Sequence, residues 1–296
     1  MRGWWREISG LVLPAACGGC GVPRTPLCEA CAAELYGSPA RRVRPDPGPP
    51  GLPVVCAAAP YADAVRAVLL AHKERGDLGL ARPLGIALAG AVRAAVSVPD
   101  PSAVRSVPDR RDGLRGSQRP TTGPHGTPGP GGTHRTGRTG GEDGARRGPL
   151  LLVPVPSARA AVRARGHDAA RRIALAAAGE LRRTGTDAVV LPVLRQRRPV
   201  ADQAGLTARA RAANLTGALR VAGGAGRLPT GGTVVAVDDL MTTGASLAEA
   251  ARALREAGAR NGVPGAASVV AAVVAAPVIS FSTEEEPVAS GKRCTQ

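Results

Sequence analysis

Residues 234–249, VVAVDDLMTTGASLAE, constrain the fold of this chain more than any other segment. Four apolar residues typical of a buried strand come first, and two adjacent acids, Asp238 and Asp239, follow directly. The next residues predict a turn and a helix start: Thr242, Thr243, Gly244, Ala245 and Ser246. A glycine turn at a helix N-terminus brings backbone amides and hydroxyl groups close to a bound phosphate. The segment therefore predicts a strand, an anion-binding turn and a helix.

An ordinary structural explanation competes with this interpretation. Asp238 and Asp239 could simply end a strand, and Ser246 with Glu249 has the spacing of a capping box. A capping box explains the helix start, but it does not explain two adjacent acids at the end of a buried strand. Two carboxylates about one sugar away from a phosphate suit the paired hydroxyl groups of a ribose.

Strands and helices alternate around this segment. Continuous apolar runs predict buried strands, and amphipathic periodicity predicts helices. The predicted strands cover residues 54–59, 150–156, 188–194, 233–237 and 267–276. The predicted helices lie around residues 65–69, 84–96, 169–183 and 246–257. Strands alternating with helices of this length predict an α/β fold with a doubly wound parallel sheet.

Composition divides the chain into parts joined by a Pro-rich linker at residues 41–53. We expect a cysteine module at residues 1–36, the first part of the α/β domain at 54–96, an insertion at 97–148, the domain core at 149–279 and a flexible tail at 280–296. The insertion is rich in Gly, Pro, Thr and Arg, so it cannot bury enough apolar area to offset its ordering entropy. It is expected to be disordered.

The chain carries a formal net charge of +16, which comes from arginine because Lys73 and Lys292 are its only lysines. Such a charge attracts polyanions, including nucleic acid. Arginine also rises together with Ala, Gly and Pro in chains of biased composition, and much of it lies in low-complexity sequence here. Aromatic side chains that stack on single strands are scarce. Charge alone therefore does not assign nucleic-acid binding.

The sequence contains no run of about eighteen apolar residues, so no transmembrane helix is expected. Residues 1–17 imitate a lipoprotein signal, with positive charge and a short apolar run before a cysteine. However, Glu7 interrupts this segment, and Cys17 is the first of four regularly spaced cysteines. We therefore expect a cytoplasmic protein.

Two cysteine pairs lie near the start of the chain, Cys17 with Cys20 and Cys28 with Cys31. Each C-x-x-C turn aims two sulfurs at one ion, so the pairs predict a structural zinc site with all four positions filled. A disulfide-linked segment is the alternative, and a cytoplasmic location argues against it. A redox role fits less well, because there are two such pairs outside a βαβ unit.

Residues 238–246 resemble the ribose-5-phosphate loop of type I phosphoribosyltransferases. The resemblance implies that Asp238 and Asp239 contact and orient the ribose during catalysis, and that the turn holds the 5-phosphate. It also implies 5-phosphoribosyl-1-pyrophosphate as substrate, with Mg²⁺, and a second loop for the pyrophosphate. The candidates in that loop are Arg163, Arg165 and Gly166, which follow the VPVP run. Arginines before a helix are also common on solvated surfaces.

The cysteine pairs ahead of this domain narrow the resemblance to the ComF family of competence-associated, amidophosphoribosyltransferase-like proteins. Tyr61 followed by Lys73, and the segment 198–214, agree with it. The resemblance implies a mobile loop that closes over the sugar, with candidates Gln203, Arg209, Arg211 and Asn214. An exposed polar helix is the alternative for these residues. At residues 167–169 the chain has His, Asp and Ala, where the family usually has an aromatic residue, Asn and Gln.

The resemblance implies transfer of a phosphoribosyl group to a nitrogen acceptor, in a protein with a role in DNA uptake. The alternative is a non-catalytic protein that senses a phosphoribosyl metabolite while its zinc module and basic surface engage single-stranded DNA or a competence helicase. The sequence does not identify the acceptor. No general base is evident: His167 is a candidate, but its position could equally be that of a loop residue.

Overall fold

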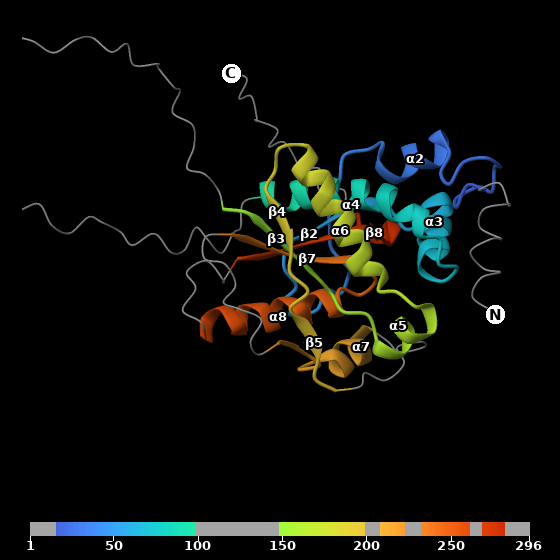
Figure 1. Cartoon of the computed structure of the whole chain (residues 1–296). Helices are drawn as coiled ribbons and strands as arrows, with labels where there is room; N and C mark the ends of the chain where they lie inside the picture. Colours follow the sequence, from blue (N-terminus) through green and yellow to red (C-terminus); the bar gives the residue numbers. More distant parts are fainter. Residues whose placement is uncertain (1–15, 99–147, 199–207, 223–231, 261–267, 282–296) are drawn as a thin grey trace, which may run out of the picture.

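The computed structural model describes residues 16–98, 148–198, 208–222, 232–260 and 268–281 (Figure 1). The strands are β1 (Arg41–Val43), β2 (Val55–Pro60), β3 (Leu150–Pro154), β4 (Ala188–Val190), β5 (Leu194–Gln196), β6 (Leu219–Val221), β7 (Thr233–Leu240) and β8 (Val269–Ala276). The helices are α2 (Glu29–Tyr36), α3 (Asp63–Lys73), α4 (Ala81–Ser97), α5 (Arg159–Arg165), α6 (Ala169–Arg183), α7 (Ala208–Leu215) and α8 (Ala245–Arg260). Two short 3₁₀ turns complete the described elements, Leu78–Leu80 and Val278–Ser280. The α/β alternation predicted from the sequence is confirmed.

Six strands form the main sheet in the order β1-β2-β8-β7-β3-β4. The neighbours from β2 to β4 are parallel, whereas β1 pairs antiparallel with β2 at the edge. The prediction of a wholly parallel sheet is therefore wrong at this edge, and so is the prediction of a plain linker at residues 41–53. β1 has only three residues, which are too few for a recognisable pattern among flanking prolines. β5 and β6 form a separate antiparallel pair.

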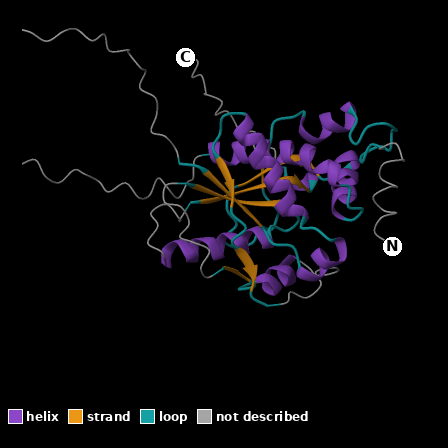
Figure 2. Cartoon of the chain, in the orientation of Figure 1, coloured by secondary structure: helices purple, strands orange, loops and turns teal. Residues whose placement is uncertain are grey.

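Helices cover both faces of the main sheet (Figure 2). α4 and α6 pack against each other on one face, and α2 and α3 lie beside them (Figure 1). α8 packs on the other face, where it also contacts α7 and β6. β8 is buried along its whole length and β7 is buried from Val234 to Val237, so the side chains of these residues are apolar on both faces of the sheet. This burial explains the continuous valine and alanine runs in the sequence.

One helical stretch, Leu78–Ser97, has the length and hydropathy of a membrane-spanning helix, although the sequence predicted none. More than half of its apolar window, 56%, is buried inside the fold. Leu84, Leu88 and Val92 are fully buried between the sheet and α6. This stretch therefore has the packing of a core helix.

The predicted elements differ from the observed ones mainly at their ends. α6 has the predicted bounds. The strand predicted at residues 188–194 is broken into β4 and β5, since Pro192 lies between them and has no N–H to donate. The predicted insertion falls outside the described residues except at its ends, as do residues 1–15 and 282–296.

The contact between α4 and α6 depends on Gly85. A Cβ atom at this position would lie 2.5 Å from Ala176 Cβ and 2.8 Å from the Ala176 carbonyl carbon, so α6 would have to move. We expect Gly85→Ala to lower the free energy of unfolding by about 1–3 kcal/mol. Gly90→Ala on the same helix is the matched control, because a Cβ there meets nothing within 4 Å. That control should stabilise the protein by about 0.5–1 kcal/mol through helix propensity.

Urea unfolding of both variants measures these effects. Equal midpoints for the two variants would contradict the close approach of α4 and α6.

Candidate functional site

The acid pair lies where the sheet changes direction. β3 and β7 are parallel neighbours in the sheet, so their carboxyl ends lie side by side. From β3 the chain continues to β4 at one edge of the sheet, whereas from β7 it continues to β8 in the opposite direction. Val155 N–H extends this pairing, because it donates to the Val237 carbonyl at 2.9 Å. In open α/β sheets, ligands bind in the crevice outside such a switch point. The structure thus brings the two predicted loops to one edge.

Asp238 and Asp239 are the sixth and seventh residues of β7, which extends to Leu240, beyond its predicted end at residue 237. Asp239 is buried, and its Oδ2 forms an ion pair of 2.8 Å with Lys73 Nζ. Asp239 N–H also donates to Asp238 Oδ1 at 2.8 Å. Lys73 is the last residue of α3. A lysine that is distant in sequence is therefore part of the site.

Burial and the two carboxylates control the charges here. Burial opposes the ionisation of Lys73, but Asp239 and Asp238 outweigh it and raise the pKa of Lys73 above its usual value. Burial also raises the pKa of Asp238 well above its usual range, and repulsion from Asp239 adds to this effect. Lys73 opposes that rise without cancelling it. The site thus combines an ionised lysine with an acid that resists ionisation while no ligand is bound.

The raised pKa of Asp238 predicts a pH-dependent stability difference. In the unfolded chain Asp238 ionises near its ordinary pKa of about 4, whereas in the folded protein it stays protonated to higher pH. Its contribution to the free energy of unfolding therefore falls as pH rises from about 4 through the raised pKa. We expect Asp238→Asn to match the wild type below pH 4 and to melt at a higher temperature near pH 7.

Melting curves between pH 3.5 and 8 measure this difference. A difference in melting temperature that is constant over that range would contradict the raised pKa. Asp187→Asn, at an exposed acid, serves as the control.

The turn after β7 has the geometry predicted for an anion site. Gly244 has φ 75°. Its carbonyl accepts a hydrogen bond from Ala248 N–H at 2.9 Å, and this is the first hydrogen bond of α8. The first amides of a helix have no acceptor within the helix, so those of α8 point out of its N-terminus. Thr242 is exposed, and Thr243 and Ser246 are half-buried. These groups can donate to a phosphate.

Glu249 shows that α8 does not begin with a capping box. Its Oε1 accepts from Leu219 N–H at 2.9 Å, and its carboxylate forms two hydrogen bonds with Arg252, at 2.8 and 2.9 Å. Burial would raise the pKa of Glu249, but Arg252 and the Leu219 amide lower it below its usual value. Glu249 therefore ties α8 to β6, and the capping-box alternative is wrong. Ser246 remains available at the turn.

The predicted pyrophosphate residues lie on two sides of α5. Arg165 Nη1 is 3.5 Å from the Lys73 carbonyl and 3.6 Å from Glu74 Oε1, so this guanidinium lies at the end of α3. Arg163 instead lines a separate pocket of about 290 Å³, together with Arg159. Gly166 caps α5 with φ 78°. The structure therefore places Arg165, but not Arg163, at the end of α3 beside Lys73, the partner of Asp239.

Two histidines lie beside Lys73, and their rings are 5.7 Å apart. His167 Nδ1 is 3.2 Å from the Arg165 carbonyl, and its Nε2 is 3.3 Å from the His72 carbonyl. His72 is fully buried, and burial lowers its pKa. Both ring nitrogens of His167 therefore face backbone carbonyls.

Little of the predicted mobile loop can be placed. Gln203 lies outside the described residues. Arg209, Arg211 and Asn214 are on α7, which packs against α8. The Asn214 carbonyl accepts from Arg198 Nη2 at 2.8 Å. The segment is thus helical near α8.

The four predicted metal ligands converge. The Sγ atoms of Cys17, Cys20, Cys28 and Cys31 all lie within 4.8 Å of one another, and none forms a disulfide. A tetrahedral ion with metal–sulfur bonds of about 2.3 Å needs sulfur–sulfur distances of about 3.8 Å, and Cys20 and Cys28 are 3.6 Å apart. The cluster can therefore hold one metal ion with four thiolates.

The backbone around Cys17 prepares its sulfur for metal binding. Burial would raise the pKa of Cys17, but the backbone N–H groups of Cys20, Cys28 and Gly19 lower it to about 6. The thiolate is the form that binds metals. A Cβ at Gly19 would lie 2.6 Å from Cys31 Sγ, so only glycine fits there.

The cysteine cluster is packed on the domain. A Cβ at Gly18 would lie 2.7 Å from Leu80 Cδ1 and 3.5 Å from Ala71 Cβ. Arg75 also reaches the Gly18 carbonyl, at 3.5 Å. Leu35 of α2 is fully buried in the main core. The cluster therefore supports α3, the helix that presents Lys73.

No family model matches this chain, and no curated protein matches it. The function must therefore be inferred from the site. The site supplies two adjacent acids, one lysine, one guanidinium and a helix N-terminus at a single sheet edge.

Proposed function

We propose that this chain is a cytoplasmic, ComF-like protein with a type I phosphoribosyltransferase fold that binds 5-phosphoribosyl-1-pyrophosphate at the carboxyl end of β7. One observation carries the proposal: Asp239 is held by Lys73 beside Asp238, and the open turn of α8 follows directly in the chain. In this arrangement the lysine corresponds to the pyrophosphate of the ligand, the two acids correspond to its ribose hydroxyl groups, and the α8 amides correspond to its 5-phosphate.

The ligand fits these groups in one orientation. Asp238 and Asp239 accept hydrogen bonds from the two ribose hydroxyl groups, and the α8 amides with Thr242 donate to the 5-phosphate. The pyrophosphate then lies toward Lys73 and Arg165. The contacts of Arg165 with the end of α3 are long, at 3.5 and 3.6 Å, so phosphate oxygens can replace them. Mg²⁺ bound with the pyrophosphate would neutralise part of its charge.

The proposed reaction transfers the phosphoribosyl group. The bond from ribose C1 to the pyrophosphate oxygen breaks, pyrophosphate leaves with the electron pair, and a nitrogen lone pair forms the new bond to C1. In the transition state between bond breaking and bond formation, the ribose has oxocarbenium character, as in glycoside cleavage. Asp238 and Asp239 orient the sugar, while Lys73 and Arg165 stabilise the charge of the leaving group.

Structural zinc is proposed for the cysteine cluster. Four thiolates fill all positions of a tetrahedral ion and leave none for a substrate, which is typical of structural zinc. Zinc would fix α2 and the support that it gives to α3.

A second function is favoured by the surroundings of His167. Both of its ring nitrogens face backbone carbonyl oxygens, so the one candidate base is not directed at a bound nucleophile. The same pocket could then serve a non-catalytic sensor of phosphoribosyl metabolites. In that case the zinc module and the basic surface engage single-stranded DNA or a competence helicase.

One experiment separates the two functions. Calorimetry of 5-phosphoribosyl-1-pyrophosphate with Mg²⁺ measures binding, and pyrophosphate release in the presence of bases and amines measures transfer. Binding with acceptor-dependent release supports the transferase, and binding without release supports the sensor. No binding at millimolar ligand would reject both.

A further inference from the structure

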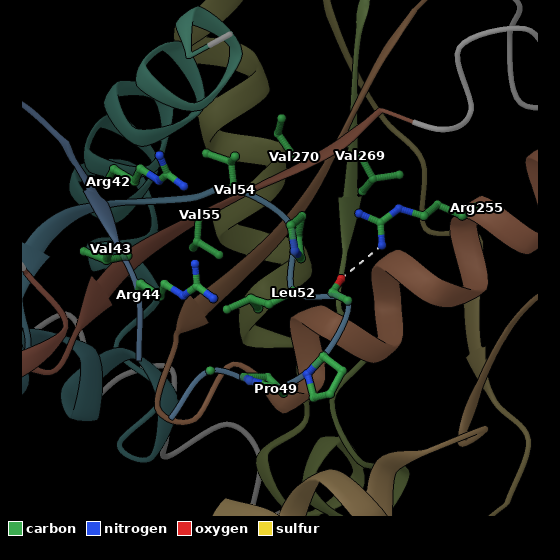
Figure 3. Close-up of a pocket in the computed structure, with 14 residues that line it drawn as sticks. Arg42, Val43, Arg44, Pro49, Leu52, Val54, Val55, Arg255, Val269 and Val270 are labelled. Atoms are coloured by element: carbon green, nitrogen blue, oxygen red, sulfur yellow. Dashed lines mark hydrogen bonds between the residues drawn. The ribbon is translucent and has the colours of Figure 1, made fainter. Parts of the chain in front are cut away.

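A second cavity, of about 360 Å³, lies away from the acid pair (Figure 3). Its walls are the first residues of β2 and β8, part of β1 with Arg44 after it, the loop 48–54 and Arg255 of α8. The acid pair instead lies near the carboxyl end of β7, and none of the candidate site residues lines this cavity. It is therefore a distinct place for a ligand.

Three arginines surround the cavity. Arg42 and Arg44 extend from β1 and the residue that follows it, and Arg255 reaches toward them from α8 (Figure 3). Arg255 Nη1 donates to the Gly51 carbonyl at 3.0 Å, which fixes its direction. The remaining lining residues are Val, Pro, Gly and Leu.

The three positive charges have no counter-charge in the described part of the chain. The fourteen lining residues include no Asp or Glu. Among the ion pairs of the described residues, none involves Arg42, Arg44 or Arg255. Guanidinium groups gathered around one cavity repel one another unless an anion lies between them.

We propose that this cavity binds a small phosphorylated ligand, with its phosphate between Arg42, Arg44 and Arg255. A guanidinium is planar and offers parallel N–H donors, which match phosphate oxygens in pairs. The volume suits a small metabolite. The valine and proline walls contact the apolar part of the ligand, and the three arginines give its orientation.

Calorimetric titration of the full chain with inorganic phosphate tests the proposal. We expect Arg42→Gln/Arg44→Gln to weaken one binding component by about tenfold or more, because two charge-assisted contacts are lost. Arg41→Gln is the matched control, since Arg41 is an exposed arginine on the same strand that does not line the cavity. It should change the affinity by less than about twofold, as expected for a remote exposed charge.

Arg255→Gln tests the opposite wall without changing β1, with Arg260→Gln on the same helix as its control. An affinity that is unchanged in both Arg42→Gln/Arg44→Gln and Arg255→Gln would overturn the proposal. So would an equal loss in the controls, which would show non-specific attraction. A second phosphate-binding component in the titration that all these variants retain is assigned to the turn at the start of α8. Loss of phosphate binding at the arginine cavity can therefore be distinguished from loss of binding at that turn.

Discussion

Replacing Cys17 by serine should release the metal and lower the melting temperature by about 6–12 °C, if the metal contributes about 3 kcal/mol to the free energy of unfolding. The expected loss is large because Cys17 is buried, and because the cluster packs on α3 and α4 through Gly18 and Leu80. Metal analysis should find one zinc ion per wild-type chain and none in the variant. Melting curves measure the stability.

The control for this prediction is Cys56→Ala. Cys56 is a buried core residue of β2 outside the cluster, and burial raises its pKa to about 11. This variant should lose stability through packing while keeping its zinc. A chelator should destabilise the wild type and Cys56→Ala but not Cys17→Ser. Chelator-insensitive melting of the wild type would exclude a structural metal.

The double variant Asp238→Asn/Asp239→Asn should weaken binding of 5-phosphoribosyl-1-pyrophosphate by about 10²-fold or more. Each carboxylate accepts a charge-assisted hydrogen bond in the proposed complex, worth about 1.5–3 kcal/mol. The double variant also leaves Lys73 without its partner at 2.8 Å. Calorimetry with Mg²⁺ measures the affinity, and release of pyrophosphate should fall at least as far.

Two controls make this result specific. Asp187→Asn removes one exposed negative charge just before β4 and should leave the affinity unchanged. The single variant Asp238→Asn is expected to be more stable than the wild type near pH 7, so its loss of affinity could not be attributed to unfolding. Wild-type affinity in the double variant would place the ligand elsewhere.

The main strands and helices could be predicted because their pattern is local. β7, β8 and α6 each carry their own apolar run or periodicity, and each was found close to its predicted position. β1 was missed because three residues, two of them arginine, carry no such pattern. Its pairing depends on β2, which supplies the neighbouring backbone.

The candidate site was predictable only in part. The acids, the turn and the cysteines form compact motifs, and the structure brings each set together. The ion pair of Lys73 with Asp239 joins residues on either side of the long insertion, so no local pattern could indicate it. The sequence also could not predict that Arg163 and Arg165 have different surroundings, because this depends on how α5 is oriented in the fold.

The packing of the cysteine cluster on α3 has a thermodynamic consequence. Gly18 lies against Ala71, and Lys73 follows one half-turn later on the same helix, in contact with Asp239. Any coupling between two binding equilibria is reciprocal, so a metal that steadies Lys73 for the ligand must itself be held more tightly when the ligand is bound. The occupancy of the proposed ligand site would then depend on the free concentration of the metal.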